Sequence, residues 1–431
     1  MKRHGKNRAA TLLLCALLAL AGLLAGCGAG EEAAEPAAAS WRLIVATDLH
    51  YLAPSLTDHG ELFWQVMEAG DGKVTEFCEE ITDAFLAEVE AACPDALILT
   101  GDLSFNGEKE SHLALSEKLA AVEEAGVPVL VLPGNHDLYR RCYSFMGEEG
   151  KRTETVDAEG FEEIYRDFGF ADALSRDSDS LSYAAQLTED IRLLMLDANT
   201  FHDFCSLSEV TLDWIEDQLA LAEAEGQRVL AACHQNLYQH SMFGSGYVLG
   251  CSEKLQALLE RHRVPLLLSG HLHIQHRMSE GGVTEIATSA LTMGACQYGV
   301  LEAEGDALRY ETRAVDVAAW AGEQGLEDER LLDFAAYAMG RLERRTRAQA
   351  EAQLTAAGFS GETLSRLTEY ACALNNGYFS GNLTKLPELD PDGELQRIWE
   401  ESNTFFGGYF ASLEPELGRD HTAWEWEKMA P

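Results

Sequence analysis

Five short clusters of carboxylate, amide and imidazole side chains stand out along the sequence, because together they could bind metal ions. In chain order the clusters are Asp48-Leu49-His50, Gly101-Asp102, Gly134-Asn135-His136-Asp137, the single His234, and Gly270-His271-Leu272-His273. Mixed imidazole and oxygen donors without a thiolate suit Mn, Fe, Zn or Co better than Ca or a cysteine-bound structural Zn. Two such ions held about 3.5 to 4 Å apart can activate a water and neutralise a phosphoryl group. The donor set by itself therefore predicts a site for divalent transition-metal ions.

Taken singly, each cluster is weak evidence for a site. A Gly-Asp pair is common, and His234 alone would more often be a structural histidine. The position of the clusters is more informative, because each directly follows an apolar run, at about 43–46, 96–99, 127–132, 229–232 and 265–268. In open α/β sheets, ligands bind beyond the carboxyl ends of the strands. We therefore expect five loops to converge on one site.

The apolar runs alternate with segments of helical periodicity, which indicates βαβ units around a buried sheet. Helices are expected at about 74–92, 110–125 and 209–225, and closing strands over 298–317. Beyond residue 318 the pattern changes to helices at about 326–357, 361–374 and 394–406, followed by an aromatic-rich tail. We expect this tail to pack against the sheet domain, although a cap over the cleft or a docking surface for the cell envelope is the alternative.

The ordered set of five clusters resembles the signature of the calcineurin-like metallophosphoesterase family, over about residues 42–317. The resemblance implies a four-layer α/β/β/α sandwich, here with a C-terminal helical extension. It implies a first metal held by Asp48, His50, Asp102 and His273, with Asp102 bridging to a second metal held by Asn135, His234 and His271. His136 would contact a phosphoryl oxygen or protonate the leaving group.

The resemblance thus predicts a dinuclear hydrolase of phosphate esters, either a phosphatase or a phosphodiesterase, whose nucleophile is a water shared by two divalent ions. The alternative is a metal-binding pseudoenzyme that serves as an envelope-associated scaffold. All seven ligands and His136 are present, which favours the enzyme. The sequence indicates neither the substrate, nor which of Mn, Fe, Zn or Co is bound, nor the oligomeric state.

The N-terminal segment reads as a targeting signal. Lys2, Arg3, Lys6 and Arg8 precede an apolar run over 9–25, and Leu24-Ala25-Gly26-Cys27 resembles a bacterial lipobox. An uncleaved membrane helix is the alternative, since the run is at the short limit for spanning a bilayer. We expect a signal peptide over 1–26, lipidation of Cys27, a tether over 27–40, a catalytic domain over 41–317 and the extension over 318–431. The protein would then be lipid-anchored outside the cytoplasmic membrane.

The charge of the chain is strongly acidic, with 72 Asp and Glu against 32 Lys and Arg, a formal net charge of −40. Such a surface repels a phosphate backbone, so no nucleic-acid-binding surface is expected. An anionic ester can still be processed where bound cations reverse the field locally. Without metals, we expect the protein neither to bind nor to hydrolyse phosphate esters.

Several features leave two interpretations open. Asp137 could orient a ligand imidazole or cap the following turn, and the stretch 243–247 could be a substrate loop or an ordinary connection. His276 could lie near the cleft, although a surface strand position is favoured, and the insertion 139–180 could be a specificity lid. One basic cluster, formed by Arg341, Arg344, Arg345 and Arg347, could bind phosphate, although pairing with nearby acidic residues is favoured.

Overall fold

The computed structural model describes residues 40–199, 204–305 and 307–427. The predicted signal peptide, Cys27 and the tether up to residue 39 lie outside the described residues. Ser40, assigned to the tether, is instead the first residue of a strand. Within the described ranges, no helix is both long enough and apolar enough to cross a bilayer.

A six-stranded mixed sheet carries the first three predicted strands side by side. Its order is β13-β12-β11-β1-β2-β3, in which β1 pairs in parallel with β2, β2 in parallel with β3, and β11 to β13 are antiparallel. The strands are β1 (Ser40–Ala46), β2 (Ala96–Leu99), β3 (Val129–Val131), β11 (Gln297–Glu304), β12 (Ala307–Ala314) and β13 (Ala423–Glu427).

A second sheet of seven strands carries the strands predicted at 229–232 and 265–268, in the order β4-β5-β6-β7-β8-β10-β9. The pairs β6–β7, β7–β8 and β8–β10 are parallel, so the carboxyl ends of β7 and β8 lie at one edge of the sheet. The strands are β4 (Ser175–Arg176), β5 (Tyr183–Thr188), β6 (Ile191–Leu196), β7 (Arg228–Cys233), β8 (Leu266–Ser269), β9 (His276–Glu280) and β10 (Val283–Ala287).

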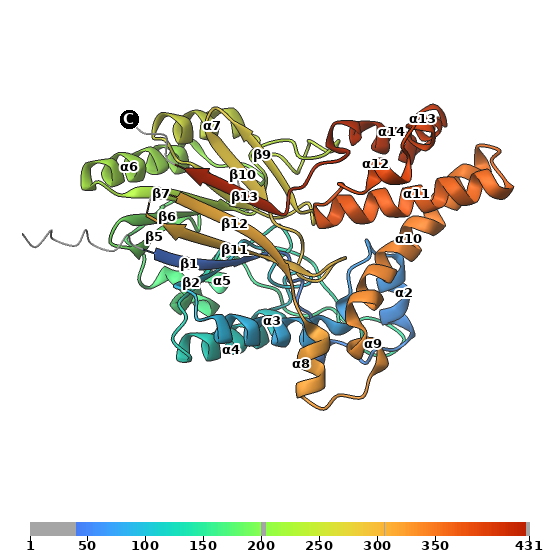
Figure 1. The fold of residues 1–431 in the computed structure, drawn as a ribbon. Coiled ribbons are helices and arrows are strands. Elements are labelled where there is room, and N and C mark those ends of the chain that lie inside the picture. Colours follow the sequence, from blue (N-terminus) through green and yellow to red (C-terminus); the bar gives the residue numbers. More distant parts are fainter. Residues whose placement is uncertain (1–39, 200–203, 306, 428–431) are drawn as a thin grey trace, which may run out of the picture. The chain divides into compact units, whose positions relative to one another are not determined.

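The two sheets lie between two layers of helices, as Figure 1 shows, with α3 (Cys78–Ala92) and α4 (Lys109–Glu124) on one side and α6 (Glu209–Glu225) and α7 (Ser252–Arg261) on the other. Strand β6 shows why both faces of the second sheet are buried. Leu193 and Met195 belong to the large core shared with the first sheet, whereas Leu194 and Leu196 pack in the core under α6 and α7. The predicted α/β/β/α sandwich is confirmed.

The C-terminal region is helical up to residue 412 and has a core of its own, centred on Tyr370, Trp399 and Phe410. The single helix predicted over 326–357 is divided, because Asp333 leaves helical geometry between two helices. The helices are α8 (Val317–Glu323), α9 (Glu329–Leu332), α10 (Phe334–Ala356), α11 (Gly361–Ser380), α12 (Leu386–Leu389), α13 (Glu394–Glu401) and α14 (Phe405–Ser412). The chain then returns to the first sheet as β13, a strand that the sequence analysis did not predict.

Shorter elements complete the chain and connect the layers. They are η1 (Pro54–Leu56), α2 (Glu61–Ala69), η2 (Thr75–Phe77), α5 (Ala158–Ile164), η3 (Arg166–Phe170) and η4 (Glu414–Glu416).

Candidate metal centre

The backbone beyond the strand ends aligns the first two ligand clusters. The N–H of Asp48 donates to the carbonyl of Gly101 at 3.0 Å, and the N–H of His50 donates to the carbonyl of Asp102 at 2.9 Å. The pairing of β1 with β2 therefore continues into both loops. Similarly, the N–H of Gly270 donates to the carbonyl of His234 at 3.1 Å, which joins the loops after β7 and β8.

Five of the predicted ligands have positive φ angles, a backbone conformation that residues other than glycine rarely adopt. The angles are 52° for Asp48, 43° for His50, 49° for Asp102, 72° for His271 and 59° for His273. The neighbouring glycines allow the loops to approach closely. A Cβ on Gly134 would lie 2.2 Å from Asp102 Oδ1, and one on Gly270 would lie 2.7 Å from Asp48 Oδ2. The loop sequences therefore accept local strain to direct these side chains inward.

One group of potential ligands consists of Asp48, His50, Asp102 and His273, with four ligand atoms within 4.8 Å of one another. His273 Nε2 lies 3.3 Å from Asp48 Oδ1 and 3.2 Å from His50 Nε2, and His50 Nε2 lies 3.8 Å from Asp102 Oδ2. Asp48 Oδ1 is buried and has no hydrogen-bond partner among the described residues. A buried carboxylate oxygen without a donor is costly unless a cation binds it, so this group fits a metal ion.

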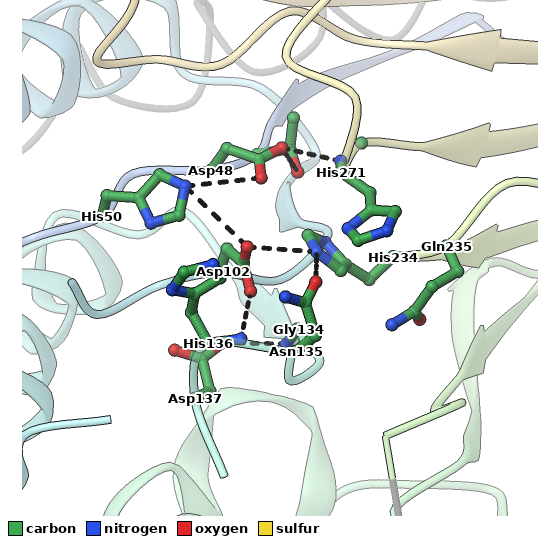
Figure 2. A network of polar contacts seen from close by, with 12 residues as sticks. Asp48, His50, Asp102, Gly134, Asn135, His136, Asp137, His234, Gln235 and His271 are labelled. Carbon is green, nitrogen blue, oxygen red and sulfur yellow. Dashed lines mark hydrogen bonds and ion pairs between the residues drawn. The ribbon is translucent and has the colours of Figure 1, made fainter. Parts of the chain in front are cut away.

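A second group consists of Asp102, His234 and His271, with Asn135 beside it (Figure 2). His234 Nδ1 donates to the Thr100 carbonyl at 2.9 Å, which leaves Nε2 facing Asn135 Oδ1 at 3.1 Å and Asp102 Oδ2 at 3.3 Å. A ring nitrogen that faces two acceptors needs a cation between them, either a proton or a metal ion. His271 Nε2 lies 2.9 Å from the Gly246 carbonyl, so its Nδ1 is the nitrogen left for an ion.

Asp102 is common to both groups. Its Oδ2 is the oxygen that both His50 and His234 approach, while Oδ1 accepts the backbone N–H of His136 at 2.7 Å. The structure thus brings all seven predicted ligands together in one buried or half-buried cluster, and Asp102 is the residue that the two groups share.

The protonation states suit metal binding. Burial alone would raise the pKa of Asp48 and of Asp102, but His273 beside the first and His234 beside the second lower both below the usual range. Burial lowers the pKa of His50, and lowers that of His271 to about 4. Burial opposes a charge on His234 as well, yet the Asp102 carboxylate raises the pKa of His234 to about 9. Without metal, a proton on His234 would occupy the place of the second ion.

His136 lies at the edge of the cluster, with its ring 5.0 Å from that of His50. Its Nδ1 lies 2.9 Å from Asn106 Oδ1 and 3.1 Å from the Phe105 carbonyl, and because carbonyl oxygens only accept, Nδ1 carries the proton. Its Nε2 has no hydrogen-bond partner among the described residues. His136 lines a cleft of about 390 Å³, whose other walls include Lys73 and Arg345. The free nitrogen is thus available to a bound ester.

Asp137 does not contact a ligand imidazole. Its carboxylate is buried and accepts from the N–H groups of Leu103 at 3.0 Å, Ser104 at 2.9 Å and Gly134 at 2.8 Å. The Asp137 carboxylate therefore stabilises the preceding turn at Gly134 and joins the loops after β2 and β3, which differs from both interpretations left open. The insertion 139–180 contributes no residue to the cleft beside His136; its Phe161 is buried in the core instead.

Two residues near the site were missed by sequence reasoning. Asp71, in the loop after α2, has its Oδ2 3.6 Å from His273 Nδ1, where it can orient that ring. Asn106 fixes the tautomer of His136. Neither stands in a recognisable motif, since both reach the site only through tertiary packing.

Several known proteins are similar to parts of this chain. A probable cyclic nucleotide phosphodiesterase from Pseudoalteromonas sp. (strain SM9913) is 25% identical over 58% of this chain and 78% of its own length. The 3′,5′-cyclic adenosine monophosphate phosphodiesterase CpdA of Escherichia coli (strain K12) is 25% identical over 48% of this chain and 66% of its own length. A dimetal phosphatase from Danio rerio matches with a TM-score of 0.47 at 12% identity, over 64% of this chain and 96% of that chain.

Two family models match different parts of the chain. Residues 316–413 match the C-terminal domain of cyclic nucleotide phosphodiesterase. Residues 42–275, more than half of the chain, match the calcineurin-like phosphoesterase model and include every residue of the two ligand groups. The chain belongs to the calcineurin-like phosphoesterase family, and it is accordingly a phosphoric ester hydrolase.

Proposed function

We propose that the protein is a dinuclear metal-dependent phosphodiesterase that hydrolyses nucleotide phosphodiesters. The observation that carries the proposal is the single oxygen, Asp102 Oδ2, that faces both ligand groups. The nucleotide substrate is supported by the two relatives, which are described as cyclic nucleotide phosphodiesterases, and by the match of residues 316–413 to the C-terminal domain of such enzymes.

Different residues of the chain would bind the metal ions and contact the substrate. Asp48, His50, Asp102 and His273 would hold one divalent ion, and Asp102, Asn135, His234 and His271 the other. When bound, these ions would supply Lewis-acid polarisation of the phosphoryl group and activation of a water nucleophile. His136, held by Asn106 through Nδ1, would place Nε2 against the ester. Once Nε2 carries a proton, it could donate to a phosphoryl oxygen or to the leaving oxygen.

The proposal is tested with purified, metal-loaded protein and a 3′,5′-cyclic nucleotide. We expect activity that disappears on chelation and returns with Mn, Fe, Zn or Co. Asp102→Asn should lower kcat at least about a hundredfold, because the bridging charge is lost while the side-chain shape stays. Bound metal, measured by mass spectrometry, should fall from two ions per chain toward one or none. Full activity after exhaustive chelation would contradict the proposal.

His136→Ala separates the enzyme from the scaffold alternative. It removes no ligand, so we expect it to keep two metal ions while losing most of its activity. A wild-type protein that binds two ions yet hydrolyses no phosphate ester would favour the scaffold.

We further propose that the chain is lipid-anchored through Cys27 outside the cytoplasmic membrane. The support is the sequence alone, in the basic and apolar segment that ends in Leu24-Ala25-Gly26-Cys27. Expression in a bacterium followed by membrane fractionation tests it. Wild-type protein should sediment with membranes and carry an acylated Cys27 by mass spectrometry, whereas Cys27→Ala should not be acylated. An unmodified wild-type cysteine would refute the anchor.

A further inference from the structure

We propose that a pocket between the catalytic core and helices α10 and α14 binds the nucleoside part of the substrate, with Arg345 at its junction with the active site and Phe243 and Phe405 as stacking surfaces. This inference rests on the proposed function and assigns the residues that would select the substrate. It also gives the C-terminal region a direct part in recognition.

The pocket adjoins the catalytic cleft. The cleft beside His136 has a volume of about 390 Å³ and includes Asp71 and Arg345 in its walls. A smaller cavity of about 170 Å³ shares both Asp71 and Arg345 and is lined farther on by Phe243 and Phe405. Because the two cavities share these walls, a ligand with its phosphate near His136 could extend into the smaller one.

Arg345 differs from Arg341 and Arg347, which are ion-paired. It differs from Arg344, which also has no partner among the described residues, in lining both cavities. Arg341 pairs with Glu76 at 3.4 Å, and Arg347 pairs with Glu343 at 2.8 Å and with Glu369 at 2.7 Å, as the sequence favoured. Arg345 forms no ion pair or hydrogen bond with any described residue, and it is only partly exposed. In a chain of net charge −40, an unpaired guanidinium at the mouth of two cavities suits an anionic or oxygen-rich ligand.

A row of aromatic rings leads from the metal centre to this pocket. The Tyr247 ring lies 5.0 Å from that of His271, and the Phe243 ring 5.8 Å from that of Tyr247. Phe243 and Phe405 then lie 6.5 Å apart with an angle of 26° between their planes, although they come from a core loop and from α14. Phe243, the first residue of the stretch 243–247 for which a substrate loop was one interpretation, is therefore part of the pocket wall.

Both rings are unusually open to solvent for phenylalanine, with exposed fractions of 39% for Phe243 and 57% for Phe405. Exposed apolar surface beside a catalytic cleft indicates a binding role. Nucleobases stack on such rings regardless of sequence, because every base has a π-face. The small volume suits one base, and the exposed amide of Gln349 in the same wall can donate to and accept from a base edge.

The test compares 3′,5′-cyclic AMP with the 3′,5′-cyclic phosphate of methyl riboside, which lacks the base. For wild type, kcat/KM should be at least about tenfold higher for cyclic AMP. Phe405→Ala should raise KM for cyclic AMP about tenfold and leave KM for the base-free analogue unchanged. Arg345→Gln should raise KM for both substrates. Phe243→Ala is a second stacking variant, should the first be poorly folded.

Two matched controls exist. Arg344→Gln removes the same charge one position away on α10, where the side chain is exposed and lines neither cavity. Leu389→Ala removes an exposed apolar side chain on α12. Neither should change KM by more than about twofold. Equal kcat/KM for the two substrates in wild type, or an unchanged KM in both phenylalanine variants, would overturn the inference.

A binding experiment keeps this test independent of turnover. Calorimetric titration of the metal-loaded protein with AMP should show binding that weakens about tenfold in Phe405→Ala and is unchanged in Arg344→Gln. Hydrolysis of a simple diester without AMP binding would refute the nucleoside pocket and leave the phosphodiesterase proposal intact. Binding of AMP without hydrolysis of any ester would refute the phosphodiesterase proposal and leave the nucleoside pocket intact.

Discussion

Asp102 shows how much of the site depends on single side chains. Its two oxygens meet His50, His234 and the backbone of His136, so one carboxylate fixes the spacing of both ligand groups and the position of the His136 backbone. The motifs in the sequence were sufficient to name all these residues. Asp71 and Asn106 were not named, because what they contribute depends on loops that meet only in the folded chain.

Glu108 carries a pH dependence of stability. The side chain is buried, Oε2 accepts the N–H of Asn106 at 2.8 Å, and Oε1 has no partner among the described residues. Burial raises the pKa of Glu108 from 4.5 to about 7. Between these values the Glu108 carboxyl holds more protons in the folded state than in the unfolded state, so its contribution to stability is highest below pH 4.5 and falls as the pH rises toward 7.

We predict that Glu108→Gln abolishes the loss of stability that ionisation of Glu108 causes as the pH rises. The amide keeps an acceptor for the Asn106 N–H and cannot ionise. Between pH 5 and pH 8, the free energy of unfolding of the variant should therefore rise by up to about 3 kcal/mol relative to that of wild type. Urea unfolding at the two pH values measures the difference. Glu110→Gln, on the exposed face of α4, is the control and should show no such change. A variant whose relative stability is the same at both pH values would refute the prediction.

At the scale of elements, the apolar runs predicted the strands that carry the ligands, because parallel strands buried on both faces read as continuous apolar segments. Strand β9 is polar and partly exposed, and only a strand position for His276 was predicted in it, without bounds. His276, on this strand, was expected at the surface, yet it is only 3% exposed. Glu416 of the C-terminal region lies 3.3 Å from its Nε2, and His240 lies 2.9 Å from its Nδ1. Because His276 is buried by a segment distant in sequence, no local pattern around it could have predicted its burial.

Strand β13 has a local signal that was not used, the alternation of Trp424 and Trp426 with Glu425 and Glu427. We predict that ending the chain after Thr422 promotes aggregation, because β12 then becomes an unpaired edge and Tyr310 loses its partner Trp424. Size-exclusion chromatography measures the monomer fraction. A chain ending after Glu427 is the control and should behave as the full chain does. An equally soluble truncation would show that the pairing is dispensable.

For the whole molecule, the residues alone indicated alternating strands and helices, and only the family resemblance implied two sheets. The reason is physical. β2 and β8 are both short and fully buried, so nothing in their composition tells which sheet each one joins. That choice depends on long-range packing. In the same way, the sequence could group Arg345 with its three neighbouring arginines but could not show that, of these four described residues, Arg345 is the one that lines the cleft beside His136.

The pairing of β1 with β11 links residues far apart in sequence, since Ser40 lies opposite Glu304. β13 adds residues 423–427 to the same sheet. During synthesis from the N-terminus, Asp48 therefore leaves the ribosome long before the strands that complete its sheet. Such non-local pairing slows folding and prolongs the exposure of apolar strands. Because β1 leads into Asp48 and is paired by β11, we expect the metal centre to reach its final geometry only after the chain has been made to about residue 304, well beyond its last ligand, His273.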